Sequence, residues 1–459
     1  MPTCVKRWNS ARAAIFWNPT DEDIKVLATG GLRDALAHGV LVRIVVPFSE
    51  LRRRLGQLRH VPLLGTGWQL LVESRAGTVA EAIARHHPGP AQDSRVELRG
   101  DNNFSEEDRV LLQRAFHDCT YVHLERMPDG TSDVYIAHAK LGGSRVGPFP
   151  LPLFVKIDKR SRAKRERDHY GECTTSFIPF YARPNLHLHR CLMGAYRGII
   201  VGDFVERSES LLELVTRGDA QSAINSLFQD ALRGWRAQSY EDKEALAENV
   251  LYKNCLPHEV LDRKRSLLDE YSAIATTLGS SLNATEVARR LDALPPIRHR
   301  RGFTHGDLHC ANVRARAGEA ILIDFHSVGP GALSTDPATL EVSLCLEFMA
   351  PEAQWLAAMN ELYSMENLRT APRPREPTTP LKPLWEAVRQ IRHYGLAEQV
   401  TDYEYCRAVA IQLIRKVAHR RNSSEQLKRR PYFIKLAAAI VLMLEGRSRA
   451  NELNILATG

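Results

Sequence analysis

Long hydrophobic runs are missing from this 459-residue sequence: the longest, Leu436 to Leu444, is well below the roughly 20 residues that cross a bilayer. The apolar segment near the N-terminus is too short and too interrupted for a signal peptide. We therefore expect a cytoplasmic protein, without export or membrane insertion. The eight cysteines include no C-x-x-C pair, which argues against a zinc ribbon or a disulfide framework and favours reduced thiols. Internal repeats and low-complexity tracts are also absent.

What the sequence does contain is typical of a globular protein, with 44% hydrophobic and 25% charged residues. The length exceeds the size at which one core keeps growing, so we expect two domains, or one two-lobed domain with an appendage. The formal charge of +8 favours anionic partners such as nucleotide phosphates, nucleic acid or a membrane surface. Spread over the whole chain, however, it is a mild excess, which favours a solvated basic surface.

The first 90 residues predict a small α/β domain. Apolar runs at 13–17, 40–46 and 68–72 read as strands, and helical periodicity separates them. The domain has no glycine-rich phosphate fingerprint and no acidic cluster, so a partner-docking module and a structural appendage both stay open. Prolines and glycines at 86–90 indicate its end, and we expect a linker over 91–104.

The most informative stretch is Phe303 to Phe325, FTHGDLHCANVRARAGEAILIDF. Asn312 lies five positions after Asp307, and Asp324 lies twelve positions after Asn312. This order and spacing is typical of a phosphoryl-transfer loop, in which one Asp accepts the proton of a substrate hydroxyl while an Asn and a second Asp hold magnesium against nucleotide phosphates. His305 begins the loop and Asp336 follows it, where we expect Asp336 to cap or anchor the next helix.

A small antiparallel sheet is predicted upstream, from strands at 121–124 and 134–139. The turn between them contains Gly130 and Ser132, whose backbone amides could cover phosphates, although an ordinary hairpin turn explains the pattern equally well.

A lysine is embedded in the apolar run from Phe154 to Ile157. Because a buried charge is costly without an anionic partner, Lys156 is a candidate ligand of nucleotide phosphates, held by a helical carboxylate. Glu166 is the first choice for that carboxylate, with Asp168 and Glu172 as competitors. Taken alone, the position would favour an ordinary edge-strand lysine.

The helix that carries Glu166 is densely basic, KRSRAKRER over 159–167. It contains no interleaved aromatic residues, so an exposed helix face is favoured and nucleic-acid binding is disfavoured. Further on, His187 and His189 stand at strand spacing within 186–191, which fits an edge strand better than a metal site because no third ligand is evident.

An apolar strand at 198–201 is followed by Asp203, Phe204 and Val205. This position suits a hinge between two lobes, whose backbone would bond the edge of an adenine. From 219 onward the periodicity is mainly helical, which fits a larger lobe that carries the acceptor substrate.

The motif His305-Gly306-Asp307-Leu308-His309 with Asn312, followed by Ile323-Asp324-Phe325, resembles the aminoglycoside phosphotransferase and choline-kinase superfamily. More narrowly, Lys156, the spacing of Glu166 and Tyr170, and the IDF segment resemble the kinase-like ternary-complex-associated domains of bacterial signalling and conflict proteins. The resemblance covers about residues 105–445. It implies an α+β, two-lobed protein-kinase-like fold, with a small antiparallel-sheet lobe and a large helical lobe, preceded by the small α/β domain.

The resemblance also implies roles for the site residues. Asp307 would deprotonate the acceptor hydroxyl, and Asn312 and Asp324 would bind Mg²⁺ that bridges the phosphates of ATP or another NTP. Lys156 would neutralise the α- and β-phosphates, and His305 would hold the shape of the loop.

The domains expected on this basis are residues 1–90, a linker at 91–104, a sheet lobe at 105–206 and a helical lobe at 207–459. The acceptor, a small molecule or a protein, is left open, as is a protein partner bound through residues 1–90. The alternative is a nucleotide-binding pseudokinase that signals through its conformation.

Overall fold

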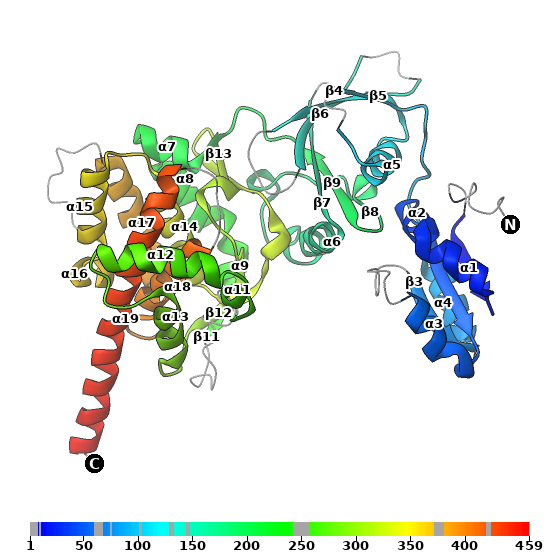
Figure 1. Ribbon diagram of the computed structural model, residues 1–459. Coiled ribbons are helices and arrows are strands. Elements are labelled where there is room, and N and C mark those ends of the chain that lie inside the picture. Colours follow the sequence, from blue (N-terminus) through cyan, green and yellow to red (C-terminus); the bar gives the residue numbers. More distant parts are fainter. Residues whose placement is uncertain are drawn as a thin grey trace. The chain divides into compact units, whose positions relative to one another are not determined.

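The computed structural model describes residues 8, 11–58, 68–73, 76–100, 103–127, 133–143, 147–149, 151–241, 258–370, 381–418 and 424–458. The chain divides into two compact units (Figure 1). The first unit comprises Met1–Tyr170 and Pro184–Glu206, and the second comprises Gly171–Arg183 and Arg207–Gly459. Within the described ranges, no helix is both long enough and apolar enough to cross a membrane.

The first unit begins with a parallel three-stranded sheet in the order β1-β2-β3, whose strands lie where the sequence predicts them. Its central strand, LVRIVV, is buried along its whole length, which is why it reads as a continuous apolar run. The strands and helices of this domain are β1 (Ala13–Trp17), α1 (Asp21–Val26), α2 (Leu32–Ala37), β2 (Leu41–Val46), α3 (Leu51–Leu58), β3 (Trp68–Val72) and α4 (Ala76–Arg85).

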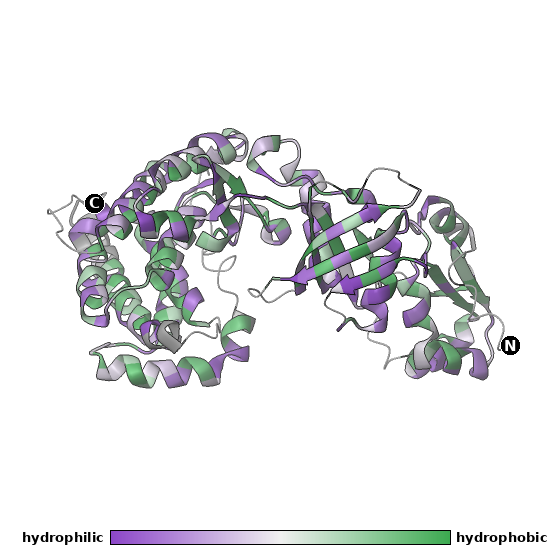
Figure 2. Ribbon diagram, turned by 90° about the horizontal axis from the view of Figure 1, so that it is seen from above, coloured by the Kyte–Doolittle hydropathy of each residue, from purple (hydrophilic) through white to green (hydrophobic). Residues whose placement is uncertain are grey.

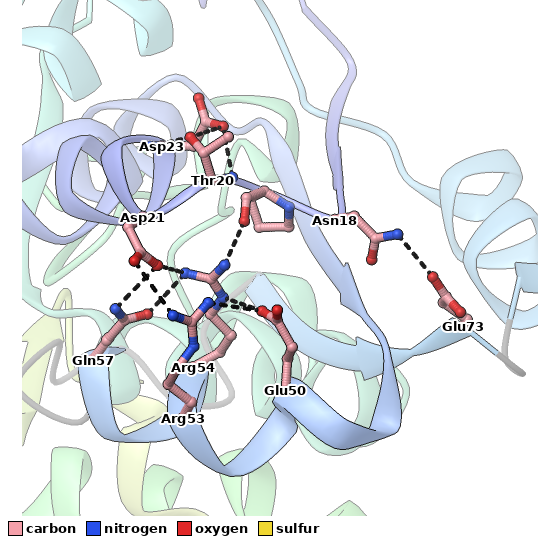
Figure 3. A network of polar contacts seen from close by, with 10 residues as sticks. Asn18, Thr20, Asp21, Asp23, Glu50, Arg53, Arg54, Gln57 and Glu73 are labelled. Atoms are coloured by element: carbon pink, nitrogen blue, oxygen red, sulfur yellow. Dashed lines mark hydrogen bonds and ion pairs between the residues drawn. The ribbon is translucent and has the colours of Figure 1, made fainter.

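The carboxyl end of this sheet, where ligands of open parallel sheets bind, is closed by a network of polar side chains (Figure 3). Asn18, directly after β1, donates from Nδ2 to Glu73 Oε1 at 2.9 Å. Arg54 of α3 is buried and donates to Glu50 Oε2 at 3.0 Å and to Asp21, the first residue of α1. These contacts fasten α1 and α3 to one another over the ends of the strands.

A six-stranded sheet in the order β4-β5-β6-β7-β9-β8 forms the rest of the first unit; only β4 and β5 pair in parallel. Polar and apolar residues alternate along its strands (Figure 2). One face packs against α5, whose first turn is capped by the hydroxyl of Ser105. The bounds are β4 (Glu97–Gly100), α5 (Glu106–Ala115), β5 (Cys119–Arg126), β6 (Asp133–Leu141), β7 (Leu153–Lys159), α6 (Arg160–His169), β8 (Leu192–Met193) and β9 (Arg197–Asp203).

The strand β7 separates two sets of side chains. Leu153, Val155 and Ile157 lie in the core that α5 covers. Because successive strand residues point to opposite faces, Lys156 points to the other face, toward α6. That helix packs close to the sheet because β9 has Gly198, where a Cβ would lie only 2.6 Å from the Cβ of Ala163. The strand period therefore places the lysine against α6.

The small α/β domain and the six-stranded sheet are in contact through α5. Arg114 is buried and donates to the carbonyl oxygens of Ala37 at 2.6 Å and Pro90 at 3.0 Å. Ala195, in the turn between β8 and β9, belongs to the apolar core of the α/β domain. Strand β4 lies inside the segment for which the sequence predicts a linker, and it pairs with β5.

The second unit is mainly helical and contains two small three-stranded sheets, β10-β13-β14 and β11-β12-β15. Its helices are α7 (Leu211–Arg217), α8 (Gln221–Ser226), α9 (Arg233–Ala237), α11 (His258–Arg263), α12 (Arg265–Thr277), α13 (Ala284–Ala293), α14 (Thr335–Glu347), α15 (Glu352–Leu362), α16 (Met365–Arg369), α17 (Lys382–Glu398), α18 (Glu404–Ala418) and α19 (Ser424–Thr458). Its strands are β10 (Glu209–Ser210), β11 (Tyr240–Glu241), β12 (Arg300–Thr304), β13 (Val313–Arg316), β14 (Glu319–Leu322) and β15 (Gly329–Ala332). The α+β class, with a sheet region and a larger helical region after a small α/β domain, is the predicted one.

One predicted strand is wrong. Residues 186–191 form a single β-bridge, Leu186 with Gly202, and then a 3₁₀ turn at Leu188–Arg190. His187 and His189 are therefore not at strand spacing. His187 instead contacts Asp203, with its Nε2 2.7 Å from Oδ1.

Candidate active site

A hairpin brings two candidate residues, Asn312 and Asp324, near one another although twelve positions separate them in the sequence. Strands β13 and β14 pair antiparallel, with Val313 opposite Leu322. The pairing continues one step further, where the amide of Ile323 donates to the carbonyl oxygen of Asn312 at 3.1 Å. Asn312 thus lies across from the residue that precedes Asp324. The spacing of twelve positions in the sequence is the length of this hairpin.

The loop that follows β12 has a fixed backbone. Gly306 has a φ of +74°, and a Cβ there would lie 2.4 Å from the carbonyl oxygen of Ser327, so only glycine fits. His305 is fully buried, with Nε2 3.0 Å from the carbonyl oxygen of Ile323 and its ring 5.8 Å from the ring of Phe325. In this position His305 connects the loop to the end of β14.

Asp336 anchors the same loop rather than capping its own helix, which corrects the prediction made for it. Its carboxylate accepts the amide of His305 at 2.7 Å and the amide of Gly306 at 3.1 Å. Burial raises the pKa of Asp336, although these two hydrogen bonds and the neighbouring positive charges act in the opposite direction. The N-cap of α14 is Ser334, whose side chain makes no capping bond.

Asp307 lies beside a cation from a distant helix. Arg415 of α18 donates from Nη2 to Asp307 Oδ1 at 3.3 Å and from Nη1 to the carbonyl oxygen of Gly306 at 3.0 Å. Burial alone would raise the pKa of Asp307, but the positive charges around it, foremost Arg415 and then His309 and Lys416, lower the pKa to about 2. The carboxylate is therefore ionised at neutral pH.

Asn312 and Asp324, the two residues predicted to bind magnesium, each carry side-chain oxygen atoms. Asn312 is buried, and its Nδ2 donates to the carbonyl oxygen of Asp307 at 2.9 Å. Asp324 takes the left-handed backbone conformation, with a φ of 66°, and its Oδ1 lies 2.6 Å from Nδ1 of His326.

This donor set fits Mg²⁺. Magnesium is typically bound in proteins by one or two carboxylates together with substrate phosphates, not by a complete protein cage. A carboxylate and a carboxamide oxygen meet that need. Among the described residues, no group of three or more His, Cys, Asp or Glu side chains gathers as a metal cage.

In the first unit, Lys156 donates from Nζ to Glu166 Oε2 at 2.8 Å. The two side chains are only 10% and 5% exposed. Of the three carboxylates considered from the sequence, Glu166 is the one in contact with the lysine, while Asp168 contacts Lys164. The partner follows from geometry, because Lys156 points to the face of the sheet on which α6 lies.

The remaining predicted ligands are less informative. Asp203 ends β9 and contacts His187, and the amide of Phe204 donates to the carbonyl oxygen of Pro152 at 3.1 Å, with Val205 next in the chain. The amide of Phe204 is thus already bonded within the protein. Gly130 and Ser132 lie outside the described residues.

Three site residues were not recognised from the sequence as part of the site: Arg415, His326 and, in its actual role, Asp336. Arg415 lies 108 positions after Asp307, and a single arginine in an apolar helix gives no local signal. His326 and Asp336 lie just downstream of Asp324, where the spacing alone does not tell a loop anchor from a helix cap.

A lysine and a glutamate paired between a strand and a helix, and a loop with Asp, Asn and Asp beside a hairpin, are residue types and local settings that resemble those of kinase-like proteins. Residues 275–440 match the family model described as ternary complex associated domain 9 (TCAD9), which confirms the predicted resemblance to such domains. The match spans the loop, α14 and Arg415.

No curated protein sequence matches the chain. Similar solved structures include a thermostable mutant of aminoglycoside phosphotransferase APH(4)-Ia, at 11% identity and a TM-score of 0.36, covering 70% of this chain and 94% of that one. A glucosamine kinase in complex with glucosamine, ADP and inorganic phosphate matches at 12% identity and 0.36, covering 75% and 85%. A choline/ethanolamine kinase family protein from Mesorhizobium loti matches at 13% identity and 0.36, covering 70% and 92%. At such identities and TM-scores, the chemistry must be argued from the residues of this chain.

Proposed function

We propose that the protein is an ATP-dependent phosphotransferase that moves the γ-phosphate of a nucleotide to a hydroxyl group of an acceptor, in the cytoplasm. The observation that supports the proposal is the loop geometry: the side chain of Asn312 contacts the backbone of Asp307, and the backbone of Asn312 pairs with the residue before Asp324. His305 and Asp336 fix the same loop. A group of turn-capping residues would not need so many anchors.

In this proposal Asp307 orients the acceptor hydroxyl and accepts its proton. Its carboxylate is ionised at neutral pH, so it is ready to accept a hydrogen bond from the hydroxyl. Asn312 and Asp324 offer their oxygen atoms to Mg²⁺, which when bound neutralises developing charge on the phosphates. Asp307 and Asn312 are held by hydrogen bonds of the loop and the hairpin, and Asp324 contacts the side chain of His326.

Lys156, in the first unit, is proposed to bind the α- and β-phosphates, with Glu166 fixing the position of its ammonium group. A buried lysine in contact with a buried glutamate is costly to keep for stability alone, since replacement by apolar residues is often neutral or favourable. Asp203, Phe204 and Val205 are proposed as the adenine-side segment, and Gly130 and Ser132 as phosphate-side amides, on their sequence positions.

Turnover of ATP tests the proposal. The wild type should hydrolyse ATP slowly and only with Mg²⁺, and Asp307→Asn should lower the rate by about 10²- to 10⁴-fold. Asp230→Asn, at an exposed position of the same unit, is the matched control and should leave the rate unchanged. Turnover that persists in Asp307→Asn would contradict the assignment. A transfer screen against small-molecule and protein pools, with Asp307→Asn as the blank, would then identify the acceptor.

The second candidate is a pseudokinase that binds nucleotide and transfers nothing. Side-chain contacts to both aspartates favour it, since Arg415 contacts Asp307 and His326 contacts Asp324. For this candidate, ATP should raise the melting temperature while no phosphate reaches any acceptor. Capture of a protein partner through residues 1–90 would then be the activity to measure.

A further inference from the structure

Arg415 contacts two neighbouring residues of the loop after β12, Gly306 and Asp307. It lies in the last turn of α18, and its guanidinium reaches the loop after β12. One nitrogen, Nη1, donates to the carbonyl oxygen of Gly306, and the other, Nη2, donates to Oδ1 of Asp307. A planar guanidinium fixes two acceptors relative to one another, which a lysine ammonium does less well.

The backbone of Gly306 is thereby held at both its N–H and its carbonyl oxygen. Its amide donates to Asp336 at 3.1 Å, and its carbonyl oxygen accepts from Arg415 at 3.0 Å. The side chain of the next residue, Asp307, receives its own contact from the same guanidinium. The two anchors come from different helices, α14 and α18, so the loop is supported by the helical core on both sides.

The helix that carries Arg415 is itself fixed. Residues 404–414 of α18 are all buried. Arg430 of α19 is buried and donates to the carbonyl oxygen of Lys416, directly after Arg415. Arg415 Nη1 also lies 3.5 Å from Gln412 Oε1, one turn earlier. The guanidinium therefore starts from a rigid backbone position.

We infer that Arg415 is a positioning residue. It holds the carboxylate of Asp307 and the carbonyl group of Gly306 in the orientation in which Asp307 can accept the proton of the acceptor hydroxyl. This inference rests on the proposed phosphotransferase function. The physical reason is orientation: a displacement of about 1 Å at a catalytic group can cost about 10²-fold in rate. Arg415 acts through Asp307, so its effect belongs to the chemical step and not to nucleotide binding.

The experiment compares Arg415→Met and Arg415→Lys with the exposed control Arg389→Met on α17. We expect Arg415→Met to lower kcat for ATP turnover by about 10- to 100-fold with an unchanged KM for ATP, and Arg415→Lys to recover part of the loss. The double variant Asp307→Asn/Arg415→Met should be no slower than Asp307→Asn, because the arginine acts through the aspartate. A loss confined to KM, an unchanged kcat or a raised kcat would overturn the inference; a raised kcat would indicate an inhibitory contact.

A readout that needs no turnover separates this inference from the proposed function. A double-mutant cycle on the unfolding midpoint in urea, with Asp307→Asn and Arg415→Met, should give a clear coupling between the two positions. Zero coupling in an active wild type would overturn the role of Arg415 alone. If the turnover of the wild type does not depend on Asp307, the proposed function is wrong, and with it the positioning role of Arg415. This holds even if the two positions are coupled in their effect on unfolding.

Discussion

Two buried ion pairs, one in each unit, look alike and differ in their surroundings. Lys156 and Glu166 pair between β7 and α6, with side chains 10% and 5% exposed. Arg392 of α17 and Glu341 of α14 pair in the helical core, and both are fully buried. Arg392 also donates to the carbonyl oxygens of Leu362 at 2.8 Å and Asn367 at 2.7 Å. The hydroxyl of Tyr405 donates to Glu341 Oε2 at 2.8 Å.

Burial by itself does not mark a functional charge, as these two pairs illustrate. The pair in the helical core ties together α14, α17 and α18, because the guanidinium and the carboxylate each bond to groups from several elements. That arrangement serves stability and specificity of packing. The lysine pair joins only one strand and one helix, and Lys156 is the residue proposed to contact the nucleotide phosphates. Removing each cation should therefore give different kinds of loss.

The largest effect on stability is expected at the helical pair. Arg392→Met leaves Glu341 buried without its partner and should lower the free energy of unfolding by about 3–5 kcal/mol. Arg389→Met, on an exposed face of the same helix, should change it by less than about 0.5 kcal/mol. Urea unfolding followed by circular dichroism measures both. MgATP should still raise the melting temperature of Arg392→Met, because the proposed nucleotide contacts are intact. If MgATP no longer raised it, the two pairs would not differ in function as argued.

At the other pair, the expected loss is mainly functional. Lys156→Met should abolish the shift in melting temperature caused by MgATP, because the proposed phosphate contact is removed. The free energy of unfolding should fall by about 1–3 kcal/mol, less than at Arg392, since this pair still reaches solvent. Thermal shift and urea unfolding of the same samples give both numbers. A variant that keeps the full nucleotide shift would remove the reason for treating the two pairs differently.

The sequence predicted the pair that follows a local pattern and missed the one that does not. Lys156 sits in an alternating strand, and Glu166 follows on the next helix, so the strand and helix periods place them together. Glu341 and Arg392 are 51 positions apart on two mostly apolar helices, and nothing in their spacing predicts that they meet.

The same limit applies at the site. Asn312 and Asp324 lie in one local segment and were singled out by their spacing, while Arg415 reaches Asp307 across 108 positions. Strand β4 was missed for a related reason: four mostly exposed residues, ELRG, carry no periodic signal, and only the pairing with β5 makes them a strand. Local periods and motifs predict which elements form. Contacts between distant helices depend on packing, which a single sequence does not state.

The smallest effect is expected at a third ion pair, which lies on the same helix as Glu166. Lys164 and Asp168 contact each other one turn apart on α6, with side chains 54% and 28% exposed. Because water screens such a pair, Lys164→Ala should change the free energy of unfolding by less than about 0.5 kcal/mol. The nucleotide shift should also stay as in the wild type.

Urea unfolding and the thermal shift with MgATP test this, beside Lys156→Met as the opposite case on the same sheet face. The three pairs would then rank by what surrounds them, from the helical core through β7 to the surface of α6. A loss of nucleotide shift in Lys164→Ala as large as in Lys156→Met would contradict that ranking. It would mean that the basic surface of α6, and not the buried Lys156 alone, contacts the phosphates.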